Sequence, residues 1–280
     1  MHLLDLDQLS STDIAGIFRL AEALQRNQED KRLAGKTIVL FFPEKSLRTR
    51  ITFEKGIRSL GGKCILFPPE ALDRKERLSD IAKYMENWAD GIVIRHASFA
   101  KITELAKHSA IPVINAMTSE NHPCEILADL YSIRERKENY RELTYTFVGP
   151  AGNIGKSWAA IAKVMNLKFN HVSAQGHQLG EQSPNYSFYT ELEEALPNSD
   201  VVLTDSWPEG FRTEEHLRDY QVTLERMTKA RPGALLNPCP PFYRGEEVSA
   251  EALASDYFVG YDFKKNLVCV QQAILLYCGV

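Results

Sequence analysis

The stretch TIVLFFPEKSLRTR, residues 37–50, decides the fold, because it joins an apolar run to the first turn of a helix. The run over residues 37–42 is rich in β-branched and aromatic side chains, a composition typical of a buried strand. Apolar residues such as Phe53 and Ile57 then recur at helical spacing and predict a helix over 48–60. The segment in between is a strand-to-helix loop, where free backbone N–H groups and the helix dipole suit an anion.

Four side chains of this loop carry groups that bind anions. Ser46 and Thr49 supply hydroxyl groups, and Arg48 and Arg50 supply planar guanidinium groups that can hold a phosphate with two hydrogen bonds. The same residues would also fit a helix N-cap followed by two solvated arginines. The chemistry of the loop alone does not separate an oxyanion cradle from such a cap.

Length and composition exclude several classes of protein. The 280 residues are enough for two domains with separate cores, and a content of 44% hydrophobic and 25% charged residues is typical of globular proteins. A net charge of −4 gives no reason to expect a nucleic-acid partner. No apolar run reaches the length of a membrane span, and residues 1–20 carry acidic residues where a signal peptide needs basic ones. We therefore expect a cytoplasmic protein without a membrane partner.

Cysteine and histidine spacing gives no sign of a metal or a disulfide framework. The five cysteines include no C-x-x-C pair, and the seven histidines include no H-E-x-x-H pattern. We expect no metal site, and scattered cysteines fit a reducing compartment.

Predicted strands and helices alternate along the chain. Strands are predicted over 37–42, 63–67, 91–95, 112–116, 144–149, 169–174, 200–205 and 234–238. Helices are predicted over 3–27, 48–60, 77–89, 99–109, 123–137, 154–166, 189–196, within 213–230, and over 249–255 and 265–278. This alternation indicates an α/β fold of two doubly wound parallel-sheet domains joined by long helices.

Polar residues or rigid turns follow most of the predicted strands. Because ligands bind at the carboxyl ends of parallel strands, these positions predict an active site in the interdomain cleft. The segments concerned are 46–50, 95–96, 121–125, 149–153, Asp205 and 238–241.

Two motifs resemble those of the aspartate/ornithine carbamoyltransferase family. They are Ser-x-Arg-Thr-Arg over residues 46–50 and His-Pro-x-x-x-Leu-x-Asp over residues 122–129. The resemblance covers nearly the whole chain and implies a site that needs no cofactor. Arg95 and His122 would be catalytic, with His122 polarising the carbamoyl carbonyl, and Asp129 would orient its helix. The implied carbamoyl-phosphate contacts are Ser46, Leu47, Arg48, Thr49, Lys75, Arg95, His122 and Glu125.

The second half of the chain resembles the ornithine branch of this family. Thr-Asp-Ser-Trp over residues 204–207 and the segment 239–248, which begins with Cys-Pro-Pro, carry this likeness. The resemblance implies catalytic roles for Asp205 and Cys239. A carboxylate and a thiolate can hold an ammonium group and accept its proton, and an amine must be neutral to attack. The implied contacts to the amine are Asn153, Asp205, Cys239 and Pro240.

The resemblance implies domains with distinct tasks. Residues 1–134, with the C-terminal helix 265–280 packed back on them, would bind carbamoyl phosphate, and residues 135–264 would bind the amine. The implied reaction moves a carbamoyl group to a primary amine, foremost ornithine to give citrulline, in a homotrimer. The alternatives are a different amine or modified amino acid, a carbamoyl-phosphate-binding homologue without transfer, and a dinucleotide-dependent dehydrogenase built on the glycine-rich turn 149–155.

Several positions depart from the family pattern. Leu47 stands where threonine is usual, and Gly152 where an arginine is common. The segment 208–210 replaces the Ser-Met-Gly of the ornithine enzymes, and Leu267 replaces an arginine that contacts the carbamoyl group.

Glu125 replaces a glutamine that contacts the carbamoyl group. An ionised carboxylate would repel the phosphate dianion and cannot donate a hydrogen bond. Two hypotheses follow: either Glu125 is protonated in the complex, or Lys75 or a nearby arginine neutralises it. The absence of an arginine at Leu267 favours protonation. In that case carbamoyl-phosphate affinity would rise as the pH falls from about 8 to 6.

Overall fold

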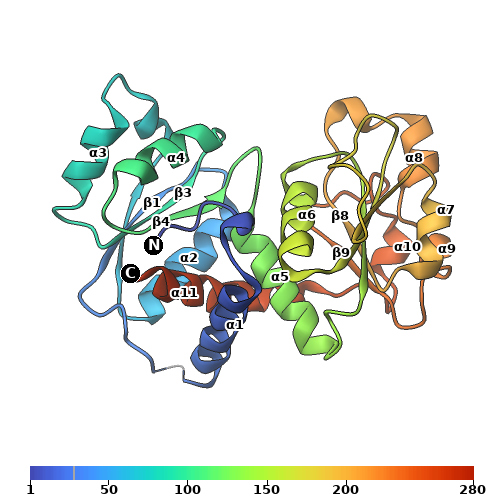
Figure 1. Cartoon of the computed structure of the whole chain (residues 1–280), viewed down its shortest axis with the longest axis horizontal. Coiled ribbons are helices and arrows are strands. Elements are labelled where there is room, and N and C mark those ends of the chain that lie inside the picture. Colours follow the sequence, from blue (N-terminus) through green and yellow to red (C-terminus); the bar gives the residue numbers. More distant parts are fainter. Residues whose placement is uncertain (28) are drawn as a thin grey trace. The chain divides into compact units, whose positions relative to one another are not determined.

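The computed structural model describes residues 1–27 and 29–280. The chain forms two compact units: unit 1 comprises Met1–Glu135 and Lys264–Val280, and unit 2 comprises Arg136–Phe263. Each unit contains a parallel sheet accompanied by helices (Figure 1), so the prediction of two parallel-sheet α/β domains is confirmed. None of the helices among the described residues is long and apolar enough to cross a membrane.

The sheet of unit 1 has four parallel strands in the order β2-β1-β3-β4. Phe41, Ile92 and Ile94 lie in one apolar cluster with residues of α3 and α4, which therefore cover that face of the sheet. The strands are β1 (Thr37–Phe41), β2 (Lys63–Phe67), β3 (Gly91–Arg95) and β4 (Val113–Met117). The helices that follow them are α2 (Leu47–Ser59), α3 (Leu78–Met85), α4 (Phe99–His108) and α5 (Pro123–Arg136).

Three helices from distant parts of the sequence pack together in unit 1 (Figure 1). They are α1 (Ser11–Arg26), α2 and α11 (Leu267–Cys278). Gly56 allows the close approach of α2 and α11, because a β-carbon there would lie 3.1 Å from Cγ of Gln272. The Gln272 side chain also donates to the carbonyl oxygen of Gly56 at 2.8 Å. The last helix is thus part of the core of unit 1.

The first helix is shorter than the predicted span 3–27. It begins at Ser11, because the hydroxyl of Ser10 accepts the backbone N–H of Asp13 at 3.2 Å and caps it. Leu3 instead forms a parallel bridge with Ile114 of β4.

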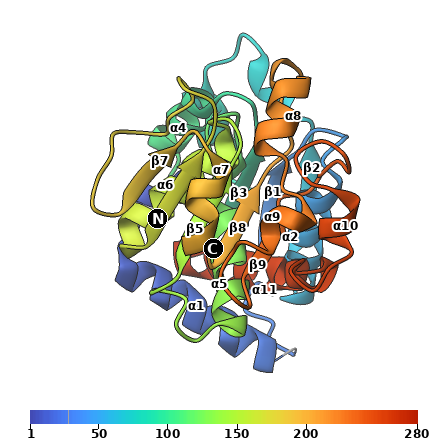
Figure 2. The same cartoon turned by 90° about the vertical axis from the view of Figure 1, so that its right-hand side faces the viewer.

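The sheet of unit 2 has five parallel strands in the order β7-β6-β5-β8-β9 (Figure 2). The strands are β5 (Thr144–Val148), β6 (Lys168–Val172), β7 (Tyr186–Tyr189), β8 (Val201–Thr204) and β9 (Leu235–Pro238). The helices are α6 (Asn153–Met165), α7 (Leu192–Ala195), α8 (Glu214–Tyr220), α9 (Leu224–Met227) and α10 (Ala250–Leu253).

Strand β7 was not predicted, and the helix expected over 189–196 begins only at Leu192. β7 pairs in parallel with β6 over four residues, from Tyr186 beside Phe169 to Tyr189 beside Val172. Its four residues are all half-buried, so no alternation of apolar and polar residues reveals it. The strand exists because β6 offers a row of backbone hydrogen-bonding groups.

Candidate active site

The hydroxyl groups of the loop after β1 contact an arginine at the end of β3. Ser46 stands at the N-cap position of α2, yet its side chain makes no capping hydrogen bond. Its hydroxyl instead accepts a hydrogen bond from Nη1 of Arg95 at 3.1 Å, and the same nitrogen lies 3.4 Å from the hydroxyl of Thr49. Both hydroxyl residues are buried, with relative exposures of 3% and 5%. The ends of β1 and β3 are thereby joined around one guanidinium group.

The two arginines of the loop differ in their surroundings. Arg50 pairs with Glu54 one turn further along α2, at 2.8 Å, as a solvated helix arginine does. Arg48 is exposed, and its charge contributes to the electrostatic field at Glu125. Of the two arginines, Arg48 is thus the one whose charge acts on buried Glu125, whereas Arg50 is paired along its own helix. Leu47 begins α2, and its side chain is 64% exposed.

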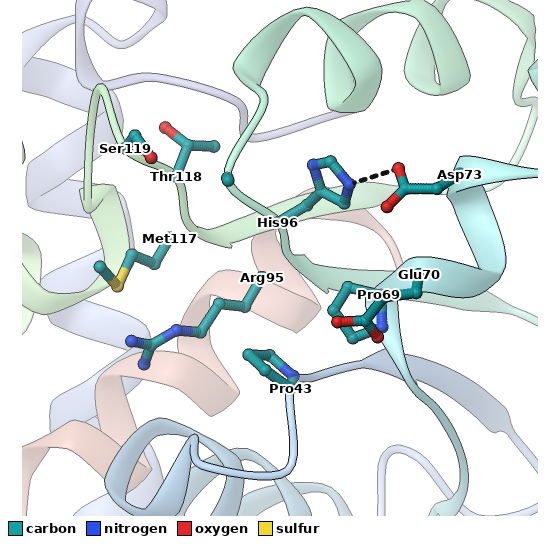
Figure 3. A pocket seen from close by; sticks show the side chains of 10 residues that line it. Pro43, Pro69, Glu70, Asp73, Arg95, His96, Met117, Thr118 and Ser119 are labelled. Atoms are coloured by element: carbon teal, nitrogen blue, oxygen red, sulfur yellow. Dashed lines mark hydrogen bonds and ion pairs between the residues drawn. The ribbon is translucent and has the colours of Figure 1, made fainter.

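The end of β3 lies beside a pocket of about 390 Å³ (Figure 3). Arg95 and His96 are consecutive there and extend in different directions. His96 contacts Oδ1 of Asp73 through Nε2 at 3.0 Å, and its Nδ1 accepts the backbone N–H of Ser98 at 2.9 Å. These contacts fix the end of the short helix 69–73 to β3. Lys75, which follows that helix, is exposed and makes no ion pair with any described residue.

His122 is buried at the start of α5, beyond the end of β4. Burial lowers the pKa of His122 to about 4, because the charged imidazolium loses its hydration. Glu125 opposes this shift, whereas the positive charges of Arg95 and Lys264 add to it. The imidazole is therefore neutral near pH 7 and has one N–H group that can donate to a carbonyl oxygen.

Glu125 is held in an ion pair that the sequence analysis did not identify. Nζ of Lys264 lies 2.8 Å from Oε1 of Glu125 and 2.6 Å from Oδ1 of Asp129. Burial would raise the pKa of Glu125, but the charge of Lys264, supported by His122 and Arg48, lowers it. The carboxylate is thus ionised, and its ion-pair partner is Lys264, a residue that neither hypothesis had named. Lys264 is 139 residues away in the sequence, so no local motif indicates the contact.

The residues expected to bind the amine lie at one edge of the sheet in unit 2. Thr204 of β8 pairs with Pro238 of β9, so Asp205 and Cys239 follow neighbouring strand ends. The backbone N–H of Cys239 donates to the carbonyl oxygen of Thr204 at 2.8 Å. Cys239 is 7% exposed, and Pro240 follows it directly. Asn153 opens α6 after β5, the other neighbour of β8.

Two glycines of the turn after β5, Gly149 and Gly155, are explained by local structure. Gly149 has a φ of +138° and accepts a hydrogen bond from Nε2 of His171 at 2.8 Å. A β-carbon at Gly155 would lie 2.7 Å from Cε1 of Phe147, so glycine lets α6 pack closely on β5. These two glycines therefore need no bound dinucleotide to account for them. Among residues 1–27 and 29–280, no cluster of three or more His, Cys, Asp or Glu side chains could hold a metal ion.

Comparison with family models covers both halves of the chain. Residues 1–135 match the model described as "Aspartate/ornithine carbamoyltransferase, carbamoyl-P binding domain". Residues 141–278 match the model described as "Aspartate/ornithine carbamoyltransferase, Asp/Orn binding domain".

Individual relatives match over nearly their full length. The chain is 33% identical to the ornithine carbamoyltransferases of Nitrobacter winogradskyi and Chromobacterium violaceum. Each alignment covers 99% of this chain and 96% of the relative. The crystal structure of ornithine carbamoyltransferase from Burkholderia thailandensis matches with a TM-score of 0.90 at 30% identity, over 98% of this chain and 97% of that one. The enzyme from Pyrococcus furiosus matches with a TM-score of 0.91 at 26% identity, over 98% and 95%.

Proposed function

Because the chain belongs to the aspartate/ornithine carbamoyltransferase family, we propose that it transfers the carbamoyl group of carbamoyl phosphate to ornithine, giving citrulline and phosphate. The observation that carries the proposal is the contact of Arg95 with both Ser46 and Thr49, which gathers three donors where the phosphate group would bind. The relatives named above, which are ornithine carbamoyltransferases, support the choice of ornithine.

The residues of unit 1 suit the acyl half of this reaction. The Ser46–Thr49 loop and Arg48 would hold the phosphate group, which is also the leaving group. As the amine attacks, negative charge develops on the carbamoyl oxygen, and donors from Arg95, His122 and Thr49 would stabilise it. Neutral His122 can donate there without titrating near pH 7. Carbamoyl phosphate is already an activated acyl donor, so positioning and electrostatics suffice.

The residues of unit 2 suit the amine half. At neutral pH the side-chain amine of ornithine is protonated, and it can attack only after losing that proton. Asp205 and Cys239 follow adjacent strand ends and would hold the ammonium group and accept its proton. Asn153 would bind the α-carboxylate end, and Pro240 would shape the amine pocket. Segment 208–210 follows Asp205 by three residues and is Pro-Glu-Gly, where the ornithine enzymes have Ser-Met-Gly.

Phosphate release tests the proposal. The protein is incubated with carbamoyl phosphate and, in turn, ornithine, lysine, putrescine, aspartate or N-acetylornithine. Release that depends on ornithine, with citrulline as the second product, is the expected result. Release with another amine would replace ornithine with that amine. If carbamoyl phosphate binds but no amine causes release of phosphate, the protein is instead a homologue that has lost carbamoyl transfer.

A homotrimer is part of the proposal. An exposed apolar surface supports it: edge strand β2 presents Ile65 and Phe67, which are 43% and 44% exposed, and α2 presents Leu47 and Ile51, which are 64% and 55% exposed. Such a surface is typical of a subunit interface. Sedimentation equilibrium tests it, and a monomeric mass at micromolar concentration would contradict it. All five cysteines are free thiols, which supports a cytoplasmic location, where citrulline would serve arginine biosynthesis.

A further inference from the structure

Lys264 is the residue at which the chain re-enters unit 1 after unit 2. Its ammonium group bridges Glu125 and Asp129, which lie one helical turn apart on α5. All three side chains are largely buried, with exposures of 18% for Lys264, 9% for Glu125 and 3% for Asp129. A buried bridge of this kind is costly to break, because removal of one partner leaves an uncompensated charge.

The position of Lys264 is fixed by its neighbour two residues on. The Asn266 side chain donates to the hydroxyl of Ser132 at 3.0 Å and to Oε2 of Glu135 at 2.5 Å. Its amide oxygen accepts from Gln25 at 2.8 Å. Segment 264–266 is thereby attached along α5 over nearly three turns. This attachment fixes the backbone from which the Lys264 side chain extends to Glu125.

The bridge to Lys264 balances the negative charge of the buried Glu125 carboxylate. Glu125 is buried three residues after His122, and the groups that lower its pKa are, in order, Lys264, His122 and Arg48. Lys264 takes Oε1, so the other oxygen can accept an N–H group of a ligand. Without Lys264, a bare carboxylate would lie beside the phosphate dianion and repel it. Asp129, the second partner, adds negative charge and makes the need for the cation greater.

Building on the proposed function, we infer that Lys264 is a positioning residue of the carbamoyl-phosphate site. It holds Glu125 in its ionised form, so that the carboxylate accepts from the carbamoyl nitrogen while its charge is balanced within the protein. Because Lys264 supplies the ion pair of Glu125, Arg95 and the N–H group of neutral His122 remain available to the ligand. Binding of the dianion consequently requires no uptake of a proton by Glu125.

The test measures carbamoyl-phosphate affinity at pH 6.5, 7.5 and 8.5, corrected for the titration of the ligand. In wild type and in Lys264→Arg, we expect the titration of Glu125 to cause little change of carbamoyl-phosphate affinity with pH. In Lys264→Met, Glu125 must bind a proton when the dianion binds, so affinity should be at least about tenfold weaker at pH 8.5 and recover by up to about tenfold per pH unit on acidification. Glu125→Gln combined with Lys264→Met removes the titrating group, so affinity should return to within about threefold of wild type, without pH dependence.

The double variant separates positioning from a merely structural role. A structural role predicts that Lys264→Met binds weakly at every pH and that Glu125→Gln does not rescue it; either result overturns the inference. If Lys264→Met does not fold, the double variant decides: a folded protein with near-wild-type affinity supports the inference, and an unfolded or weakly binding one contradicts it. Lys36→Met is the matched control, because Lys36 pairs with Asp90 at 2.9 Å on the surface of the same unit. A wild-type protein that does not bind carbamoyl phosphate contradicts the proposed function, whereas failure confined to the variants contradicts only the role of Lys264.

Discussion

Nη1 of Arg95 lies 3.1 Å from the hydroxyl of Ser46, so the guanidinium group at the end of β3 is fixed to the loop that follows β1. The contact follows from the sheet, because β1 and β3 are neighbours and end at the same edge, where we propose that phosphate binds. The donors are therefore positioned before any ligand arrives, and the ligand does not have to order them.

Arg48→Ala should remove most carbamoyl-phosphate binding and leave the fold intact, because Arg48 is exposed at the start of α2. Loss of a charged pair with a phosphate should cost about 2–4 kcal/mol of binding free energy. Isothermal calorimetry measures it. Arg50→Ala is the matched control: Arg50 pairs with Glu54, so affinity should change little. Equal losses in the two variants would show that Arg48 is not the residue that faces the ligand.

Cys239→Ala should lower kcat strongly with ornithine while carbamoyl-phosphate affinity stays near that of wild type. The reason is position: Cys239 follows β9 beside Asp205 in unit 2, whereas the donors of the phosphate cradle belong to unit 1. Steady-state kinetics and calorimetry on the same preparation measure the two quantities. Turnover near the wild-type value would mean that Cys239 serves only to fill its buried position.

Stability should fall on acidification because of buried His171. Burial lowers the pKa of His171 to about 4, whereas the unfolded chain titrates near the ordinary value of 6.5. Between these values the unfolded state binds more protons, so the free energy of unfolding decreases as the pH is lowered. At pH 5 the loss is about 2 kcal/mol relative to pH 7.5.

Urea unfolding at both pH values of wild type and His171→Gln measures this contribution. The variant should lose less stability on acidification than wild type does. Buried His122 titrates in the same direction, so part of the dependence should remain in the variant. The same pH dependence in both proteins would contradict the assignment to His171.

Gly155→Ala should destabilise unit 2 by about 1–3 kcal/mol, because the new methyl group would overlap Phe147 and overpack the contact between α6 and β5. Gly210→Ala is the control, since no atom lies within 4 Å of a β-carbon built there. Chemical denaturation compares the two. A variant at Gly155 as stable as the control would show that α6 can shift to make room.

Local patterns in the sequence revealed the parts of the fold and site that depend on neighbouring residues. The strand-to-helix loop at Ser46 and the alternation of strands and helices follow from short stretches, and both appear in the structure. Edge strand β7 was missed, because it depends on the pairing surface of β6 and not on its own four residues. The first helix was predicted too long, because Leu3 pairs with Ile114 of β4 through a tertiary contact that the sequence does not reveal.

The partner of Glu125 shows why part of the site could not be predicted. The departure from glutamine was visible in the sequence, and so was the need for a cation. Its identity depends on where the segment before α11 attaches to α5, a tertiary contact without a local signature. The hypothesis that Glu125 is protonated in the complex was made without Lys264, whose charge lowers the pKa of Glu125 in the ligand-free protein.

The return of the chain at Lys264 also governs the order in which the protein can be assembled during synthesis. The ribosome completes unit 2 before it makes Lys264 and α11, although both belong to unit 1. Domains generally fold as units, and N-terminal ones fold first during translation. Unit 1 is an exception that must wait: its nascent form carries Glu125 and Asp129 without their cation, and lacks the helix that covers α1 and α2. The proposed anion site can therefore be completed only after the whole of unit 2 has been synthesised.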